Sequence, residues 1–80
     1  ALMLFATRTC PNCRQAEEQL HRAGIPYRKV LAEENPDLTV RYGVRQAPTL
    51  VAENGGAPVK VVGLGAIRTF IQENRVADAG

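Results

Sequence analysis

Cys10 and Cys13 are the only cysteines among the 80 residues of this sequence, and Pro11 and Asn12 separate them. Two thiols at this spacing can close and reopen a disulfide, so the segment indicates thiol–disulfide exchange. The attacking species in that exchange is a thiolate, whereas a free cysteine with a pKa of ~8.5 is only slightly ionised at neutral pH. The elements that hold the two cysteines must therefore favour a negative charge on one of them.

The two cysteines lie between a predicted strand and a predicted helix. Residues 2–6 are an apolar run too short for a helix, and such runs are typical of a strand buried on both faces. Pro11 suits the first position of a helix, and apolar residues then recur at three- and four-residue spacing. Gly24 supplies a stop, which predicts a helix over residues 11–23. The helix residues that fall largely away from the apolar stripe are Glu17, Glu18 and Arg22.

These elements assign different roles to the two thiols. Cys10 would lie at the N-terminal cap of the helix, where unpaired N–H groups and the positive end of the helix dipole stabilise an anion. Cys13 would lie about one turn into the helix, on its apolar side with Ala16. We expect Cys10 to attack a disulfide and Cys13 to resolve the mixed disulfide that forms.

The rest of the chain predicts a single α/β domain over residues 1–80. A second strand follows the helix, and this β-α-β connection is expected to be right-handed with parallel strands. The Asn-Gly-Gly segment at residues 54–56 favours an antiparallel hairpin. The further predicted elements are strands at 27–31, 49–53 and 59–62, a short helix from Asn35-Pro36 to near Gly43, a closing helix at 66–74 and a frayed tail at 75–80. The order β-α-β-α-β-β-α predicts a four-stranded mixed sheet with flanking helices.

Composition narrows the function classes. Ten basic and eight acidic side chains are interspersed and give a net charge of +2, so no basic stripe suggests a nucleic-acid partner. No run approaches the roughly 20 apolar residues that a membrane helix needs. The N-terminal apolar run lacks a basic start and is too short for a signal peptide. We therefore expect a cytoplasmic protein with no nucleic-acid or membrane partner.

The predicted order, with Cys-x-x-Cys between the first strand and the first helix, resembles the thioredoxin fold. Motifs of the back half fall in the order that thioredoxins show: Asn35-Pro36, Tyr42-Gly43-Val44-Arg45, Ala47-Pro48-Thr49-Leu50, Asn54-Gly55, Val62-Gly63 and Phe70. The front half instead resembles glutaredoxins, whose motif begins Cys-Pro. It lacks the tryptophan before the motif and the acidic residue in the first strand that thioredoxins have. The chain thus resembles a compact hybrid of the two families, similar to the small redoxins that serve ribonucleotide reductase.

The resemblance implies a set of residues that would bind the substrate. Pro48 is similar to a proline that thioredoxin-fold proteins hold cis beside the cysteines, and the backbone of Ala47 would pair with an extended segment of the substrate. Arg8 is similar in place to a lysine of glutaredoxins and would stabilise the Cys10 thiolate. The expected substrate-binding residues are Pro11, Asn12, Ala47, Pro48 and Gly63.

The activity that the resemblance implies is that of a dithiol–disulfide oxidoreductase. Its substrates would be protein disulfides, with ribonucleotide reductase as one candidate, and no cofactor is expected beyond the redox-active Cys10–Cys13 disulfide itself. Glutaredoxins carry Gly-Gly, a polar residue and an Asp before the last helix, and that Asp helps to hold glutathione. Here the segment is Gly63-Leu64-Gly65-Ala66, which favours an NADPH-dependent thioredoxin-type reductase over glutathione as the electron donor.

Other interpretations of the cysteine pair remain open. A closed zinc site needs four ligands, and beyond the two thiols the chain offers only His21 and carboxylates, so a metal site would need a dimer. We expect no metal. His21 lies one turn or more from the cysteines and is expected at the surface, and no proton acceptor for Cys13 is identified. The remaining alternatives are a static disulfide, a non-catalytic binding module and a glutathione-dependent glutaredoxin.

Overall fold

The computed structural model of the chain describes residues 2–53 and 55–74. In chain order, its elements are β1 (Leu2–Ala6), α1 (Pro11–Arg22), β2 (Arg28–Leu31), η1 (Ala32–Glu34), α2 (Pro36–Arg41), β3 (Thr49–Ala52), β4 (Val59–Val62) and α3 (Leu64–Glu73). This is the predicted order β-α-β-α-β-β-α, with the short 3-10 helix η1 added between β2 and α2. Residue 54 of the predicted turn and the predicted tail at 75–80 lie outside the described residues.

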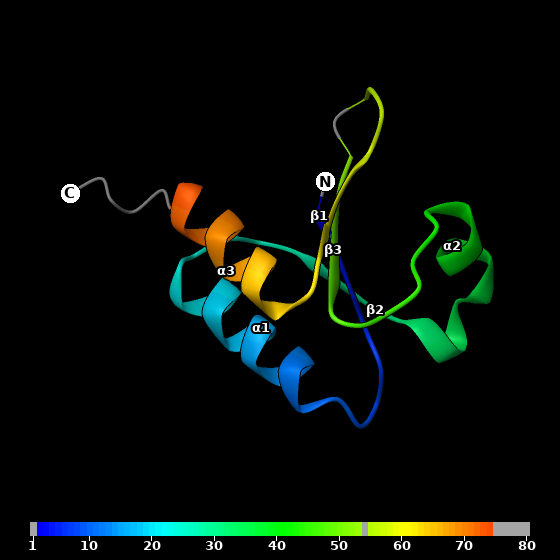
Figure 1. The fold of residues 1–80 in the computed structure, drawn as a ribbon, viewed down its shortest axis with the longest axis horizontal. Helices are drawn as coiled ribbons and strands as arrows, with labels where there is room; N and C mark the ends of the chain where they lie inside the picture. The colour runs from blue at the N-terminus through cyan, green and yellow to red at the C-terminus, as the bar shows by residue number, and fades with distance from the viewer. Residues whose placement is uncertain (1, 54, 75–80) are drawn as a thin grey trace.

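The strands form one mixed sheet in the order β2-β1-β3-β4 (Figure 1). Strand β1 is parallel to β2, to which α1 connects it, and antiparallel to β3, which is in turn antiparallel to β4. The register pairs Phe5 with Val30 on one side and with Thr49 on the other. The end of β1 that leads to the cysteines therefore lies beside the start of β3.

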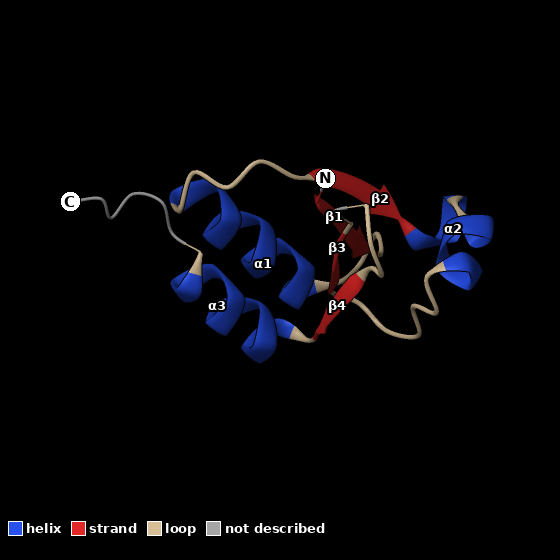
Figure 2. Cartoon of the chain, turned by 90° about the horizontal axis from the view of Figure 1, so that it is seen from above, coloured by secondary structure: helices blue, strands red, loops and turns tan. Residues whose placement is uncertain are grey.

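Helices cover both faces of the sheet, and Figure 2 shows α1 and α3 packed together on one face with η1 and α2 on the other. Successive residues of a strand point to opposite faces, so β1 and β3 each contribute to two cores. The core under α1 and α3 consists of Leu4, Ala16, Leu20, Ala23, Leu50, Ile67 and Ile71. The core on the opposite face consists of Met3, Phe5, Val30 and Val51, against which Leu38, Tyr42 and Val44 pack. The predicted burial of the first strand on both faces is confirmed.

Helix α1 begins and ends close to the predicted residues. Pro11 occupies the first helical position, where its missing N–H costs no hydrogen bond. At the other end, Gly24 adopts a φ of +70°, a left-handed conformation that residues with a side chain rarely adopt. The following Ile25 N–H donates to the Leu20 carbonyl at 3.0 Å, which closes the last turn.

Helix α3 begins at Leu64, two residues before the predicted start at residue 66. The cap residue Gly63 has a φ of +93°, and its carbonyl accepts the N–H of Ile67 at 3.0 Å. The apolar pattern did not reveal this first turn because Gly65 is a weak helix former. The helix start is instead set by the conformation of Gly63.

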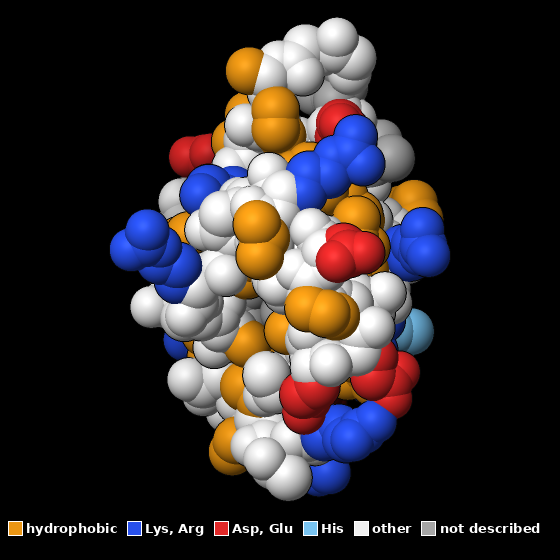
Figure 3. Space-filling model, turned by 90° about the vertical axis from the view of Figure 1, so that its right-hand side faces the viewer, with side chains coloured by type: hydrophobic (Ala, Val, Ile, Leu, Met, Phe, Trp, Pro, Cys, Tyr) orange, Lys and Arg blue, Asp and Glu red, His pale blue; other side chains and the backbone are white. Residues whose placement is uncertain are grey.

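The surface shows no concentration of one charge sign on the face drawn in Figure 3. Lys and Arg side chains lie among Asp and Glu side chains there, with single hydrophobic side chains between them. None of the helices in the described ranges is both long enough and apolar enough to cross a membrane.

Candidate active site

Cys10 occupies the N-terminal cap of α1, as predicted. Its backbone is extended, with φ −123° and ψ 104°, and its Sγ accepts the N–H of Cys13 at 3.2 Å. The Cys10 carbonyl also accepts the N–H groups of Cys13 at 3.1 Å and of Arg14 at 3.3 Å. The half-exposed side chain lines a surface pocket of about 360 Å³ together with Arg8, Thr9, Pro11 and Arg14. A substrate disulfide can therefore reach the Cys10 sulfur.

Cys13 is buried under the first turn of the same helix, with 2% of its surface exposed. Its burial raises the pKa of the Cys13 thiol from 9.0 to about 11, and the hydrogen bond with Cys10 adds to this rise. The charges of Cys10 and Glu17 raise the pKa further, whereas a hydrogen bond from the Thr7 backbone lowers it. Cys13 is therefore a protonated thiol at neutral pH.

The two cysteines differ in access and in hydrogen bonding, although both are free thiols in the structure. A thiolate at Cys10 would keep the N–H donor of Cys13, and donors at a helix N-terminus stabilise an anion. Cys13 lies one turn away beneath it, out of reach of a large substrate. This arrangement suits attack by Cys10 followed by attack of Cys13 on the Cys10 sulfur.

Pro48 lies at the edge of the sheet from which β1 leads to the cysteines. The Ala47–Pro48 peptide bond is cis, as the resemblance implied, and Pro48 is buried. Its carbonyl accepts the N–H of Gly63 at 2.9 Å. Three of the expected substrate-binding residues, Ala47, Pro48 and Gly63, are thus brought together at the start of β3.

The other expected substrate-binding residues, Pro11 and Asn12, are exposed on the first turn of α1. Arg8 lies just before them and lines the pocket at Cys10. Its guanidinium forms an ion pair with Glu34, and its backbone N–H donates to the Glu33 carboxylate at 3.2 Å. These contacts tie the loop after β1 to η1, and the role of Arg8 beside the Cys10 thiolate stays a prediction.

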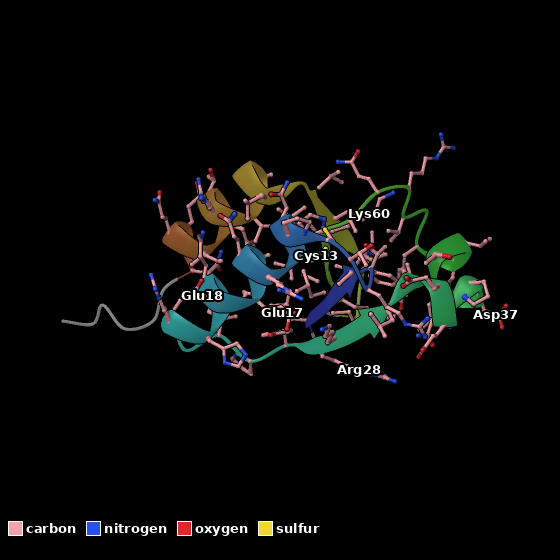
Figure 4. All side chains as sticks on the ribbon, turned by 90° about the horizontal axis from the view of Figure 1, so that it is seen from below. Cys13, Glu17, Glu18, Arg28, Asp37 and Lys60 are labelled. Atoms are coloured by element: carbon pink, nitrogen blue, oxygen red, sulfur yellow. The ribbon has the colours of Figure 1, made fainter. Side chains whose placement is uncertain are left out.

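Glu17 does not lie on a solvated face of α1, and the expectation that it falls away from the buried side was wrong. Only 23% of its side chain is exposed, and the carboxylate lies between α1 and β2, where it accepts the Tyr27 hydroxyl at 3.2 Å and pairs with Lys29 Nζ at 3.0 Å (Figure 4). Its position one turn after Cys13 could have revealed it, because residues four apart share a helix face. His21 is exposed, as expected, with Nε2 at 3.1 Å from the Tyr27 hydroxyl.

No group of three or more His, Cys, Asp or Glu side chains within residues 2–53 and 55–74 is arranged to hold a metal ion. A closed zinc site takes four ligands. A metal at Cys10 and Cys13 would therefore need ligands from outside the described part of the chain.

Solved structures show where else this fold occurs. The chain superimposes on thioredoxin from Trypanosoma brucei brucei with a TM-score of 0.76 and 20% identity, covering 99% of this chain and 74% of that chain. Mitochondrial thioredoxin 3 from Saccharomyces cerevisiae superimposes with a TM-score of 0.71 and 20% identity, covering 90% of this chain and 76% of that chain. Oxidised thioredoxin from Plasmodium falciparum superimposes with a TM-score of 0.74 and 17% identity, covering 94% of this chain and 80% of that chain. At these identities the likeness shows the thioredoxin fold alone.

The sequence itself carries the family signal. No curated protein matches the chain significantly. The family model described as glutaredoxin matches residues 2–55, a segment that includes both cysteines and Pro48 and covers more than half of the chain. With the thioredoxin fold and a Cys-Pro-Asn-Cys motif at the cap of α1, the chain belongs to the glutaredoxin family.

Proposed function

We propose that this redoxin is a dithiol–disulfide oxidoreductase that reduces protein disulfides through Cys10 and Cys13. The observation that carries the proposal is the difference between the two thiols on α1. Cys10 is half-exposed in a surface pocket, whereas Cys13 is buried beneath it with a pKa of about 11. One thiol can meet a substrate, and the other stays protonated until the first has reacted.

The reaction transfers two electrons and two protons to the substrate. The Cys10 thiolate attacks one sulfur of the substrate disulfide, so a mixed disulfide forms and the first substrate thiolate leaves. Cys13 then loses its proton and attacks the Cys10 sulfur, which breaks the mixed disulfide and releases the second substrate thiolate. The two substrate thiolates take up protons, and the protein is left with a Cys10–Cys13 disulfide. An external reductant must reopen that disulfide.

The start of α3 favours a thioredoxin-type reductase as that reductant. Glutathione-binding glutaredoxins carry an Asp just before the last helix, whereas here the first turn of α3 contains no acidic residue. The cap residue Gly63 is followed directly by Leu64 and Gly65. The match to the glutaredoxin family keeps glutathione as the alternative donor, and the substrate proteins, with ribonucleotide reductase as one candidate, are part of the same proposal.

A coupled assay of NADPH oxidation tests the function and the donor together. Insulin serves as the disulfide substrate, and the protein is supplied either with thioredoxin reductase or with glutathione and glutathione reductase. We expect turnover with thioredoxin reductase that is lost in Cys10→Ser. Turnover with glutathione only would contradict the proposed thioredoxin-type reductase but would support the disulfide exchange through Cys10 and Cys13. Silence in both arms would overturn the proposed activity and favour a binding module.

A further inference from the structure

A polar cluster lies beside the active site but takes no part in the exchange reaction described above. Glu17 is its centre, because the carboxylate accepts the Tyr27 hydroxyl at 3.2 Å and pairs with Lys29 Nζ at 3.0 Å. Lys29 belongs to the edge strand β2, and Tyr27 lies just before that strand. Glu17 is thus held between α1 and the sheet by two groups from one segment.

The hydrogen bonds show which groups of the cluster donate and which accept. The Tyr27 hydroxyl donates to Glu17, so the contact of 3.1 Å between that hydroxyl and His21 Nε2 is made with the nitrogen as donor. Burial, followed by the charge of Glu17, raises the pKa of Tyr27 to about 12, so the hydroxyl keeps its proton. Glu17 is therefore held by a hydroxyl donor, Tyr27, and by the ammonium group of Lys29.

Cys13 is the reactive group closest along α1 to this cluster. Glu17 follows it by four residues, which places both side chains on the buried face of the helix, about 5–6 Å apart at their Cβ atoms in such a pair. Figure 4 shows both side chains on the side of α1 that faces the sheet. After burial and the influence of Cys10, the negative charge of Glu17 also raises the pKa of the Cys13 thiol.

Cys10 and the Thr7 backbone are the further groups that influence the pKa of Cys13. Lys29 contacts Glu17, with its Nζ at 3.0 Å from the carboxylate. Helix α3 packs against α1, but its charged residues Arg68 and Glu73 are exposed. Arg68 contacts the Gln15 side chain at 3.5 Å rather than Glu17.

We propose that the Glu17–Lys29 ion pair, anchored by Tyr27, regulates the resolving step of Cys13 electrostatically. The proposal rests on the function above, in which Cys13 resolves the mixed disulfide. Glu17 acts here as a positioning residue that exchanges no bond with the substrate. Its charge adds to the effect of burial in delaying the ionisation of Cys13, and Lys29 limits that addition by partly neutralising the carboxylate.

The two members of the ion pair should act in opposite directions. Glu17→Gln removes a negative charge near Cys13, so the thiol should ionise at a pH lower by about half a unit. Lys29→Met leaves Glu17 uncompensated, so the thiol should ionise at a higher pH. Glu18→Gln is the matched control, since Glu18 is the neighbouring carboxylate of α1, is exposed and pairs with Arg22 at 3.0 Å. Figure 4 shows Glu18 farther along the helix from Cys13 than Glu17.

The test titrates Cys13 as the lone thiol in a Cys10→Ser background by thiolate absorbance. A shift to lower pH in Glu17→Gln, a shift to higher pH in Lys29→Met and no shift in Glu18→Gln would support the proposal. The proposal would be overturned if the pH at which Cys13 ionises did not shift in Glu17→Gln, or if it shifted in the same direction in Glu17→Gln and Lys29→Met. This titration needs no substrate or reductase, so it stands even if the coupled assay is silent.

The rate of resolution provides the second readout. With both cysteines present, dithiobis-nitrobenzoate reacts first at Cys10, and Cys13 then releases the second nitrothiolate. A lower pKa increases the thiolate fraction but weakens the nucleophile, so Glu17→Gln should speed the second release about two-fold at neutral pH. A slower second release in Glu17→Gln would contradict electrostatic restraint and would instead make Glu17 the proton acceptor of Cys13.

Discussion

Cys10 and Cys13 carry the same thiol group, and only their positions on α1 distinguish them. The sulfur of Cys10 lies at the helix cap and accepts a backbone N–H, whereas the sulfur of Cys13 lies in the core. Taking a thiol out of water disfavours its charged form. The difference in burial and hydrogen bonding between the two cysteines is thus a consequence of one helical turn.

At the residue scale, the raised pKa of Cys13 links ionisation to stability. Below about pH 9 this thiol is protonated in both the folded and the unfolded chain, so it contributes no pH dependence. Between about pH 9 and 11 the unfolded chain releases the proton while the folded chain keeps it, so the free energy of unfolding falls as the pH rises. The full shift corresponds to a loss of roughly 2–3 kcal/mol once the pH exceeds the folded pKa, and the loss is smaller in a variant without the Cys10 thiol, which contributes to the shift.

Urea denaturation at about pH 8 and about pH 10.5 measures this loss. Cys10→Ser keeps Cys13 as the lone thiol, and Cys10→Ser combined with Cys13→Ala is its control without a thiol. Tyr27 and Tyr42, whose pKa values are also raised, are present in both variants and therefore cancel. Equal losses of stability in the two variants would contradict the raised pKa of Cys13.

At the element scale, the helix that carries the cysteines owes its position to packing rather than to the motif. Leu20 is fully buried beneath α1, in the core that α1 and α3 share with the sheet. Removing most of a buried leucine side chain costs roughly 2–5 kcal/mol. We therefore expect Leu20→Ala to lower the free energy of unfolding by an amount in that range.

Val40→Ala provides the comparison, because Val40 on α2 is 81% exposed and its truncation should change stability by less than about 0.5 kcal/mol. The urea concentrations at which Leu20→Ala and Val40→Ala are half unfolded at neutral pH measure the difference in stability between them. If both variants unfolded at the same urea concentration, the assignment of the core would be wrong.

The elements themselves were largely predictable from local signals. Pro11 and Gly24 mark the two ends of α1. Short apolar runs, bounded by polar or glycine-containing segments, mark the strands. Local signals failed where a tertiary contact decides the structure. The first turn of α3 follows Gly63, whose N–H donates to the Pro48 carbonyl at 2.9 Å, and η1 is held in part by Arg8, which contacts Glu33 and Glu34 from another part of the chain.

The candidate site was predictable to a similar degree. The spacing of Cys10 and Cys13 predicts a reacting pair, and the predicted helix start places Cys10 at the cap and Cys13 inside the helix, where the structure has them. The partial burial of Glu17 was not predictable from the apolar stripe of α1, because its partners Tyr27 and Lys29 lie in and just before β2. A periodic pattern says which side of a helix is apolar, and it does not say which polar side chain a neighbouring strand will cover.

At the scale of the whole molecule, the chain joins features of two related groups of proteins. Its sequence belongs to the glutaredoxin family over residues 2–55, while thioredoxins are among the solved structures that share its fold. The sheet brings the N-terminal cysteines and the Ala47–Pro48 segment to one edge, since β1 and β3 are neighbours. The parallel β1–α1–β2 unit carries the two proposed nucleophiles, and the antiparallel half carries the Ala47–Pro48 segment where we expect the substrate to dock.

The central claim is that Cys10 attacks and Cys13 resolves. The most direct measurement incubates reduced Cys13→Ser with insulin and analyses the product by mass spectrometry without reductant. We predict a stable mixed disulfide through Cys10 in Cys13→Ser, no comparable adduct in Cys10→Ser, and an intramolecular disulfide with reduced insulin in the unmodified protein. Absence of an adduct in Cys13→Ser, or an equally abundant adduct through Cys13 in Cys10→Ser, would contradict the mechanism.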